Sequence, residues 1–115
     1  MIKINKKYTA NNLKKKVEQL RKQGKKIVLS SGSWDMLHVG HMRYLSVAKQ
    51  KGDFLIVGVD SDEKIKKRKG PERPIVHEDE RMEMLSHLVS VDAIFLKKHT
   101  DKSGHLIKLV SPDIL

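Results

Sequence analysis

SSGSWDMLHVGHMRYL, residues 30–45, joins two sequence patterns of different period. The apolar run that leads into it, residues 26–31, is typical of a buried strand. After it, apolar residues recur at helical spacing as far as Gly52. The stretch is therefore predicted to be a strand, a loop and the start of a helix, and that loop is where an α/β domain places its working residues.

The rest of the chain repeats this alternation. We predict helices over residues 11–23, 61–67, 78–89 and 103–110, and strands over 53–59, 91–96 and, in its first residues only, 113–115. Strands that alternate with helices predict an α/β fold with a parallel sheet. No interior linker or repeat divides the sequence, so we expect one domain over residues 1–115.

The composition narrows the class of protein. A chain of 115 residues with 38% hydrophobic content can bury one core. No window approaches the roughly 18 apolar residues of a transmembrane helix, so we expect no membrane partner. The first twelve residues lack the apolar run of a signal peptide. The absence of cysteine excludes disulfides and thiolate metal sites, and we expect a cytoplasmic protein.

The net charge of +10 comes from two basic clusters. Ten of the 24 basic residues lie in the first 26 positions, where Glu18 is the only acid. Basic clusters can bind nucleic acid, nucleotide phosphates or an acidic membrane surface. We interpret the first cluster as a solvated surface. The second cluster is kept as a candidate for binding phosphate; it consists of Lys64, Lys66, Lys67, Arg68, Lys69 and Arg73.

The loop after the first predicted strand has the features of a phosphate site. A helix N-terminus offers unpaired N–H groups and a favourable dipole to an anion. Gly32 allows a turn, and Gly40 allows a close approach to the backbone. His38 and His41 would share one face of the helix. A two-histidine metal site and a purely structural role remain alternatives. The two common glycine-rich phosphate motifs, the P-loop and G-x-G-x-x-G, are absent from the sequence.

The segment GSWDMLHVGH resembles the signature of the cytidylyltransferase-like nucleotidyltransferases: a glycine, an aromatic–aspartate pair and then H-x-G-H. Trp34 stands where the family more often has phenylalanine or tyrosine. A second stretch, VGVDSD…KKRKGPERPIVHEDERMEML, is similar to the family's lysine–glycine loop and its helix bearing E-R. Within the family the pattern is most similar to the adenylyltransferase domain of ADP-heptose synthases, with glycerol-3-phosphate cytidylyltransferase a near relative. The resemblance implies a Rossmann-like three-layer α/β/α fold.

The resemblance also implies a reaction. An NMP group would pass from an NTP to a phosphorylated sugar or alcohol, with release of pyrophosphate. ATP is favoured, and a CTP-dependent glycerol-3-phosphate or phospho-alcohol cytidylyltransferase is the alternative. Catalysis would consist of positioning and charge neutralisation, with Mg²⁺ as cofactor. The partners would be the NTP and a small phosphorylated substrate, without nucleic acid, and analogy with relatives suggests a homodimer. A nucleotide- or RNA-binding module without turnover is the alternative of another class.

The same resemblance assigns roles to residues. His38 and His41 would contact the triphosphate and stabilise the transition state. Lys69 would reach the α- or β-phosphate, with Lys66 the next candidate. The catalytic set is His38, His41, Lys69 and Arg81, and the nucleotide-binding set is Gly32, Ser33, Trp34, Asp35, Gly40 and Lys66.

Three further assignments have open alternatives. Arg81 would fork onto a phosphate, or would instead pair with Glu78 or Glu83 on the helix surface. Asp35 would bond near the histidines or assist magnesium binding. Asp62 would hold the acceptor substrate or simply start a helix.

Family sequences continue beyond the SPDIL segment with the rest of a strand, a loop and a helix whose serine- and threonine-rich segment touches the nucleotide. We therefore expect this chain to be truncated at its C-terminus, and its site to lack one wall.

Overall fold

The computed structural model describes residues 5–115, and its centre is a sheet of three parallel strands. The strands are β1 (Ile27–Gly32), β2 (Phe54–Asp60) and β3 (Ala93–Lys97), in the order β1-β2-β3. The register pairs Ile27 with Phe54 and Ile56 with Ala93. Residues 1–4 of the predicted single domain lie outside the described residues.

Single parallel bridges extend both edges of the sheet. Lys7 bridges Ile94 beside β3, and Ile114 bridges Val28 beside β1. The strand predicted to start near residue 113 is thus represented by one bridge, in which the Leu29 N–H donates to the carbonyl of Ile114 at 2.9 Å. The chain therefore runs from β1 through β2 to β3 and then returns to the far side of β1.

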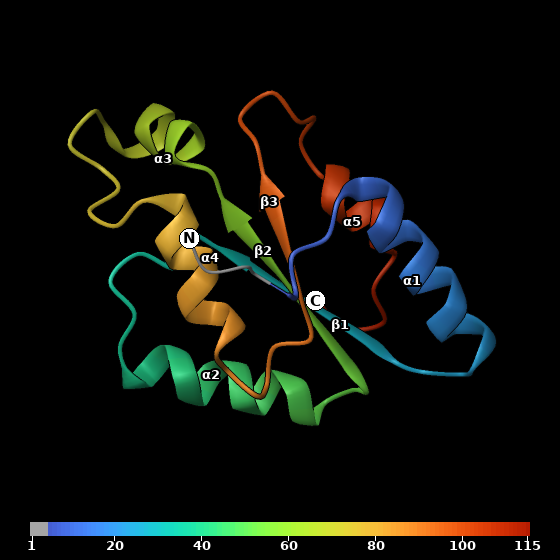
Figure 1. Cartoon of the computed structure of the whole chain (residues 1–115). Helices are drawn as coiled ribbons and strands as arrows, with labels where there is room; N and C mark the ends of the chain where they lie inside the picture. Colours follow the sequence, from blue (N-terminus) through green and yellow to red (C-terminus); the bar gives the residue numbers. More distant parts are fainter. Residues whose placement is uncertain (1–4) are drawn as a thin grey trace.

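Helices cover both faces of the sheet (Figure 1). Helices α1 (Ala10–Lys22) and α5 (His105–Val110) lie on one face. Helices α2 (Val39–Gln50) and α4 (Glu78–Ser86) lie on the other. A shorter helix, α3 (Asp62–Lys69), follows β2. These layers confirm the predicted three-layer α/β/α arrangement.

Each face of the sheet has its own apolar core, because successive residues of a strand point to opposite faces. Leu29 and Ile56 face α1 and α5, whereas Val28 and Val57 face α2 and α4. The helices contribute the periodic residues that the sequence pattern singled out. On one side these are Leu13, Val17, Leu20, Leu106 and Val110, and on the other Leu45, Met82 and Leu85.

The boundaries of some elements differ from the predicted ones. Helix α4 ends at Ser86 rather than near residue 89, and the Ser86 hydroxyl donates to the carbonyl of Glu83 at 2.5 Å in its last turn. Strand β3 begins at Ala93 rather than residue 91, since the Asp92 carboxylate accepts the Leu55 N–H at 2.7 Å and ends the loop before the strand. Helix α3 extends to Lys69 rather than ending at residue 67.

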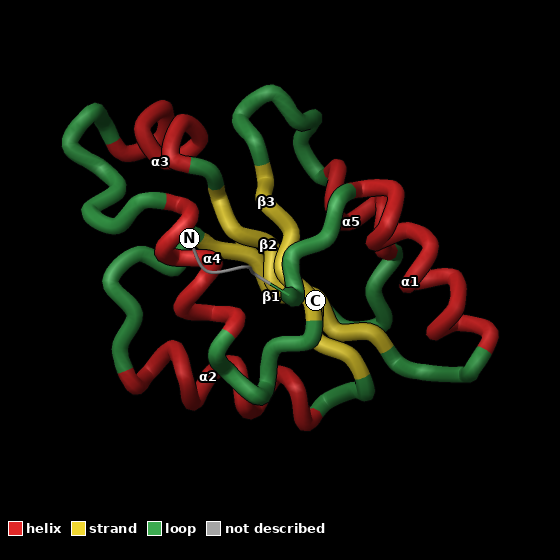
Figure 2. The backbone as a smooth tube through the Cα atoms, viewed as in Figure 1, coloured by secondary structure: helices red, strands yellow, loops and turns green. Residues whose placement is uncertain are grey.

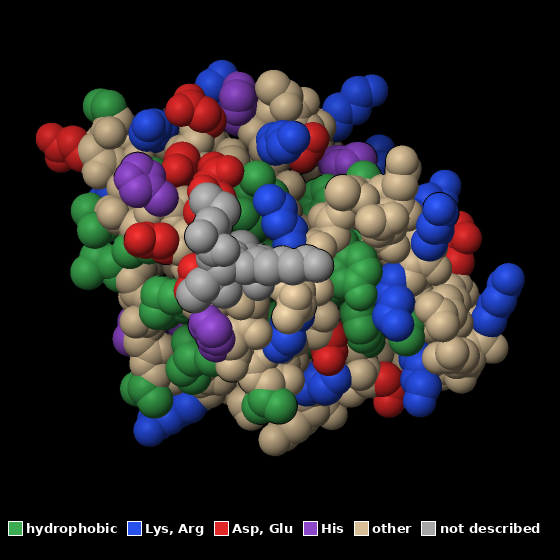
Figure 3. Space-filling model, in the orientation of Figure 1, with side chains coloured by type: hydrophobic (Ala, Val, Ile, Leu, Met, Phe, Trp, Pro, Cys, Tyr) green, Lys and Arg blue, Asp and Glu red, His purple; other side chains and the backbone are tan. Residues whose placement is uncertain are grey.

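Five of the ten basic residues of the first cluster lie in α1, whose inner face is apolar; they are Lys14, Lys15, Lys16, Arg21 and Lys22. Figure 3 shows lysine and arginine side chains spread over this side of the molecule, which agrees with a solvated surface for part of the cluster. Two members make specific contacts instead: Lys6 donates to the carbonyl of Leu88 at 2.7 Å, and Arg21 pairs with Asp113 at 2.8 Å. Within residues 5–115, no helix combines the length and the apolar character needed to cross a bilayer.

Candidate functional site

The loop between β1 and α2 occupies the position where an open α/β sheet usually binds its ligand. One neighbour of β1 is β2, reached through α2, and the other is the bridge at Ile114, reached from β3 through α5. The direction of chain winding therefore reverses at β1. Ligands of such sheets bind beyond the carboxyl ends of the strands at this reversal. Figure 2 shows the loop over residues 33–38 and the loop over residues 70–77 on the same side of the molecule.

His38 and His41 lie together at the start of α2. The Nδ1 atom of His38 accepts the Gly40 N–H at 3.0 Å, and the Nδ1 atom of His41 accepts the His38 N–H at 3.1 Å. The two ring centroids are 4.1 Å apart. A neutral imidazole whose Nδ1 accepts carries its proton on Nε2. Each ring is thus a donor through Nε2–H, and neither Nε2 atom has a hydrogen-bond partner within residues 5–115.

Its surroundings favour the neutral form of His41. Burial lowers the pKa of His41 below the ordinary 6.5, and the neighbouring His38 lowers that pKa further. A lowered pKa means that the ring stays uncharged at neutral pH and gains a proton only in more acidic solution. The pair therefore offers two fixed N–H donors at a helix N-terminus, an arrangement suited to the oxygens of a phosphate chain.

The buried ring of Trp34 packs against His41 of the pair. Its side chain is buried, and its Nε1–H donates to the carbonyl of Gly58 at 3.0 Å. The ring meets that of His41 edge-on, with 5.8 Å between centroids. Trp34 was predicted in the nucleotide-binding set, but the structure places it in the core, where it orients His41.

The two predicted glycines make room for these rings. A Cβ on Gly40 would lie 2.6 Å from Cε1 of His38, which real contacts do not allow. A Cβ on Gly32 would lie 3.3 Å from the Trp34 ring. Both glycines therefore serve the packing of the site's own side chains, in addition to any approach by a ligand.

Asp35 ties the loop over residues 33–38 to the loop before α4. Its two carboxylate oxygens accept the N–H groups of Ile75 at 2.8 Å and Val76 at 2.9 Å. Partial burial alone would raise the pKa of Asp35. The two N–H donors and the charges of Arg81 and Arg73 outweigh this effect and lower the pKa. The expected bond near the histidines is not the one observed, because both oxygens are committed to the second loop.

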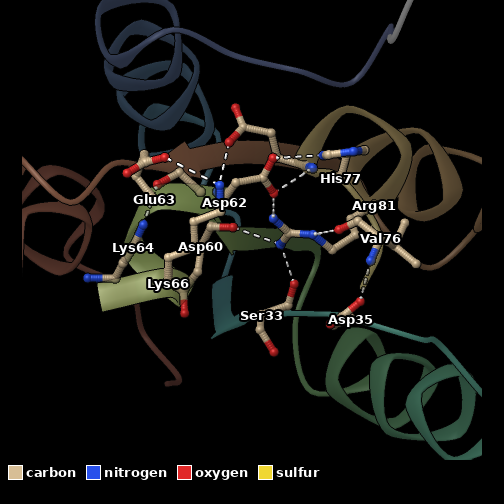
Figure 4. A network of polar contacts seen from close by, with 12 residues as sticks. Ser33, Asp35, Asp60, Asp62, Glu63, Lys64, Lys66, Val76, His77 and Arg81 are labelled. Carbon is tan, nitrogen blue, oxygen red and sulfur yellow. Dashed lines mark hydrogen bonds and ion pairs between the residues drawn. The ribbon is translucent and has the colours of Figure 1, made fainter. Parts of the chain in front are cut away.

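Arg81 differs most from its predicted role. Its side chain is 1% exposed, and its guanidinium points inward. The Nε–H donates to the carbonyl of Val76 at 2.8 Å, and Nη1 donates to the carbonyls of Ser33 at 2.5 Å and Asp60 at 2.7 Å. Nη2 donates to Oδ1 of Asp62 at 2.8 Å (Figure 4). This arginine joins the loops after β1 and β2 to the start of α4, and its donors are used by protein acceptors.

Asp62 joins the N-termini of two helices. Its Oδ1 accepts the Glu78 N–H at 2.9 Å, while Oε1 of Glu78 accepts the Asp62 N–H at 2.8 Å. Each helix therefore has its first turn capped by a carboxylate from the other. The helix-start alternative for Asp62 is the one observed, since its carboxylate is also paired with Arg81. Arg81 therefore pairs with Asp62 and not with Glu78 or Glu83, as the surface alternative predicted.

The predicted lysines occupy the outer side of α3. Lys66 pairs with Glu63 at 3.7 Å on the exposed helix surface. Lys69 is exposed at the helix end, before Gly70 with φ +102°, and makes no ion pair within residues 5–115. Of the two, Lys69 is the side chain whose charge is left unpaired.

Asp60 is a residue of this region to which the sequence analysis assigned no role. It ends β2, is 3% exposed, and pairs with Arg68 at 2.9 Å. Its second oxygen, Oδ1, has no hydrogen-bond partner and lies 3.8 Å from Nζ of Lys97. A carboxylate at the end of an otherwise apolar strand is a signal that could have marked it.

The part of the chain that the structure describes has no cluster of three or more His, Cys, Asp or Glu side chains able to hold a metal ion. The two-histidine metal site considered above therefore gains no third protein ligand. A divalent ion here would need most of its ligands from elsewhere.

Known proteins resemble this chain in sequence and in structure. Residues 29–115 match the Cytidylyltransferase-like family. The chain is 44% identical over 103 residues to the Bifunctional protein HldE of Desulfatibacillum aliphaticivorans. This match covers 90% of this chain and 21% of that protein. It is 46% identical over 98 residues to the protein of the same name from a Nitratiruptor species. This second match covers 85% of this chain and 21% of that protein. The chain thus spans about a fifth of the length of these curated relatives.

A solved structure shares the fold. The crystal structure of the lipopolysaccharide core biosynthesis protein from Thermoplasma volcanium GSS1 matches with a TM-score of 0.67 and 34% sequence identity. The match covers 78% of this chain and 71% of that chain. The predicted Rossmann-like arrangement is confirmed by this similarity.

Proposed function

The chain belongs to the cytidylyltransferase-like family, and on that premise we propose that it transfers an NMP group from an NTP to the phosphate of a phosphorylated sugar or alcohol. The observation that carries the proposal is the pair of Nε2–H donors of His38 and His41 at the N-terminus of α2. Both rings are fixed by backbone bonds through Nδ1, so their free donors are held in place before a ligand arrives. Fixed donors of this kind stabilise charge that develops in a transition state.

The reaction needs no covalent step on the protein. An oxygen of the acceptor phosphate attacks the α-phosphorus of the NTP and forms a new P–O bond. The bond from the α-phosphorus to the bridging oxygen breaks, and pyrophosphate leaves with those electrons. The two imidazoles donate hydrogen bonds to phosphate oxygens as negative charge moves toward the leaving group. Lys69 adds a positive charge from the end of α3.

We propose ATP and a sugar phosphate as substrates. The support is the similarity of the sequence to the adenylyltransferase domain of ADP-heptose synthases, together with the HldE relatives. CTP with glycerol 3-phosphate or another phospho-alcohol is the second choice. The same proposal includes a cytoplasmic location, because the reaction consumes nucleoside triphosphates. It also includes a homodimer, by analogy with relatives.

The Mg²⁺ that we expect would come with the nucleotide. The described residues offer no carboxylate cluster for it, and Asp35 has both oxygens committed to backbone N–H groups. Mg²⁺ commonly takes its ligands from substrate phosphates and water and neutralises their charge. The protein's own contribution would then be the histidine pair and the lysine.

The proposed function is tested by measuring pyrophosphate release. ATP and CTP would each be paired with a heptose 1-phosphate and with glycerol 3-phosphate. We expect the highest rate with ATP and the heptose 1-phosphate. Binding of ATP without pyrophosphate release from any pair would contradict the proposal and favour a nucleotide- or RNA-binding module.

Replacing Lys69 by alanine should raise KM for ATP and lower kcat. An unpaired lysine that contacts a phosphate makes a charge-assisted bond, so we expect a loss in kcat/KM of about tenfold or more. Steady-state kinetics at fixed acceptor concentration would measure it, with Lys22→Ala on α1 as the control. An unchanged kinetic profile would move the assigned role to Lys66 or Lys67.

A further inference from the structure

Helix α3 is short, basic and anchored by few contacts. Of its eight described residues only Ile65 is buried, and its last turn carries four successive cations, from Lys66 to Lys69. A helix of this length has little stability of its own in water. Figure 1 shows α3 beyond the carboxyl end of β2. The position of its last turn therefore depends on the contacts that this turn makes with other elements.

A buried carboxylate joins the last turn of α3 to the sheet. Asp60, the last residue of β2, is 3% exposed, and its Oδ2 atom accepts a hydrogen bond from Nη1 of Arg68 at 2.9 Å. Within residues 5–115, no other side-chain hydrogen bond or ion pair links residues 66–69 to a different element. This contact therefore fixes the end of α3 relative to the end of β2.

The carboxylate of Asp60 is held from the side of the sheet. Its carbonyl accepts a hydrogen bond from Nη1 of Arg81 at 2.7 Å, and its Oδ1 atom lies 3.8 Å from Nζ of Lys97, its neighbour in register on β3. Oδ1 has no hydrogen-bond partner, and an unsatisfied buried acceptor lowers stability. Buried ion pairs often add little net stability, and in some proteins they specify geometry instead. These features favour a role for Asp60 in placing Arg68 over a role in stabilising the fold.

The residue next to Arg68 is the lysine of the proposed site. Lys69 is the last residue of α3, and the Gly70 N–H ends the helix by donating to the carbonyl of Lys66 at 2.9 Å. A lysine has a flexible four-carbon side chain, so the place of its ammonium group is defined only if the backbone below it is fixed. The bond between Arg68 and Asp60 fixes that backbone.

We propose that Asp60 is a positioning residue for nucleotidyl transfer: through Arg68 it holds the last turn of α3 and so sets where Lys69 meets the triphosphate. The inference rests on the proposed function, because it needs Lys69 at a phosphate. Asp60 itself touches no substrate. Without the contact Lys69 would keep its charge but lose order, and the free energy of ordering it would then reduce nucleotide binding.

Two variants weaken the contact from its two ends. Arg68→Met removes the donor from a side chain that is 49% exposed, so the protein should fold as before. Asp60→Asn keeps the size of the buried group and replaces an ion pair by a hydrogen bond to a neutral amide. We expect Arg68→Met to lower kcat/KM for ATP by about threefold to tenfold, and Asp60→Asn to lower it less. Lys108→Met removes one charge from the last turn of α5 and is the matched control, with kcat/KM unchanged.

A double-mutant cycle with Lys69→Ala shows whether the effect passes through Lys69. In the Lys69→Ala protein, neither Arg68→Met nor Asp60→Asn should cause a further loss in kcat/KM. A general loss of structure would not give this pattern, and neither would a direct bond from Arg68 to a phosphate. Losses of the same size with and without Lys69 would overturn the proposal.

Hydrogen exchange gives a readout that does not depend on turnover. The Gly70 amide should exchange faster in Arg68→Met than in the unaltered protein, because it lies at the released helix end. The Leu13 amide, which donates to the carbonyl of Thr9 at 2.9 Å in the first turn of α1, should exchange as before. Unchanged exchange at Gly70 would overturn the proposal. A protein that releases no pyrophosphate with any acceptor would refute the proposed function instead, and the same cycle would then be run on the dissociation constant for ATP, with the same pattern expected.

Discussion

His41→Ala is expected to lower kcat by about 10²-fold or more, the usual cost of removing a preorganised donor to a transition state. The Nε2–H of His41 has no protein partner within the described residues, and its ring is fixed by the His38 N–H and the Trp34 ring. Its lowered pKa keeps the neutral donor form at pH 7. Single-turnover rates with saturating ATP would measure the loss without interference from product release.

Two variants separate catalysis from helix capping. His41 also accepts the His38 N–H, so alanine removes a cap as well as a donor. His41→Asn retains a side-chain acceptor near that N–H and should preserve more of the stability of α2, while turnover stays low. His87→Ala, in an exposed histidine at the end of α4, should leave kcat unchanged. A kcat for His41→Ala within about twofold of the unaltered protein would exclude His41 as a transition-state donor.

The sequence predicted the parts of the site that depend on local spacing. His38 and His41 meet because residues three apart in a first helical turn share one face, and that helix follows a recognisable apolar strand. The layers of the fold were predictable for the same reason, since Leu13, Val17 and Leu20 alternate with lysines at helical period. These patterns need no knowledge of what lies elsewhere in the chain.

The sequence does not reveal the contacts of residues whose partners lie in distant loops. Nothing local shows that Asp35 bonds to Ile75 and Val76, or that Asp62 and Glu78 cap each other's helices. These contacts join segments 16 to 41 positions apart. A charged residue in a motif can be read as binding a ligand when it binds the backbone of another loop.

Arg81→Met is expected to destabilise the protein by about 3–5 kcal/mol, the range for removing one partner of a buried charged contact. Methionine retains much of the side-chain length but no donor. The carbonyls of Ser33, Asp60 and Val76 and the carboxylate of Asp62 would each lose a bond. A domain of this size has roughly 5–15 kcal/mol of stability, so the loss would be a large fraction of the total. Urea unfolding followed by tryptophan fluorescence would measure it, with Trp34 as the only tryptophan.

The location of these bonds extends the prediction from stability to kinetics. Arg81 holds the carbonyl of Ser33, at the beginning of the histidine loop, against the end of β2 and the start of α4. Arg81→Lys keeps the charge but reaches fewer acceptors, so it should fold with an intermediate loss of stability. If Arg81 positions the loop, Arg81→Lys should lower kcat more than it raises KM for ATP, because misplaced donors lose transition-state stabilisation first. If Arg81 turned outward to bind phosphate, KM for ATP would rise and unfolding would change by less than about 1 kcal/mol, as expected for the surface control Arg43→Met.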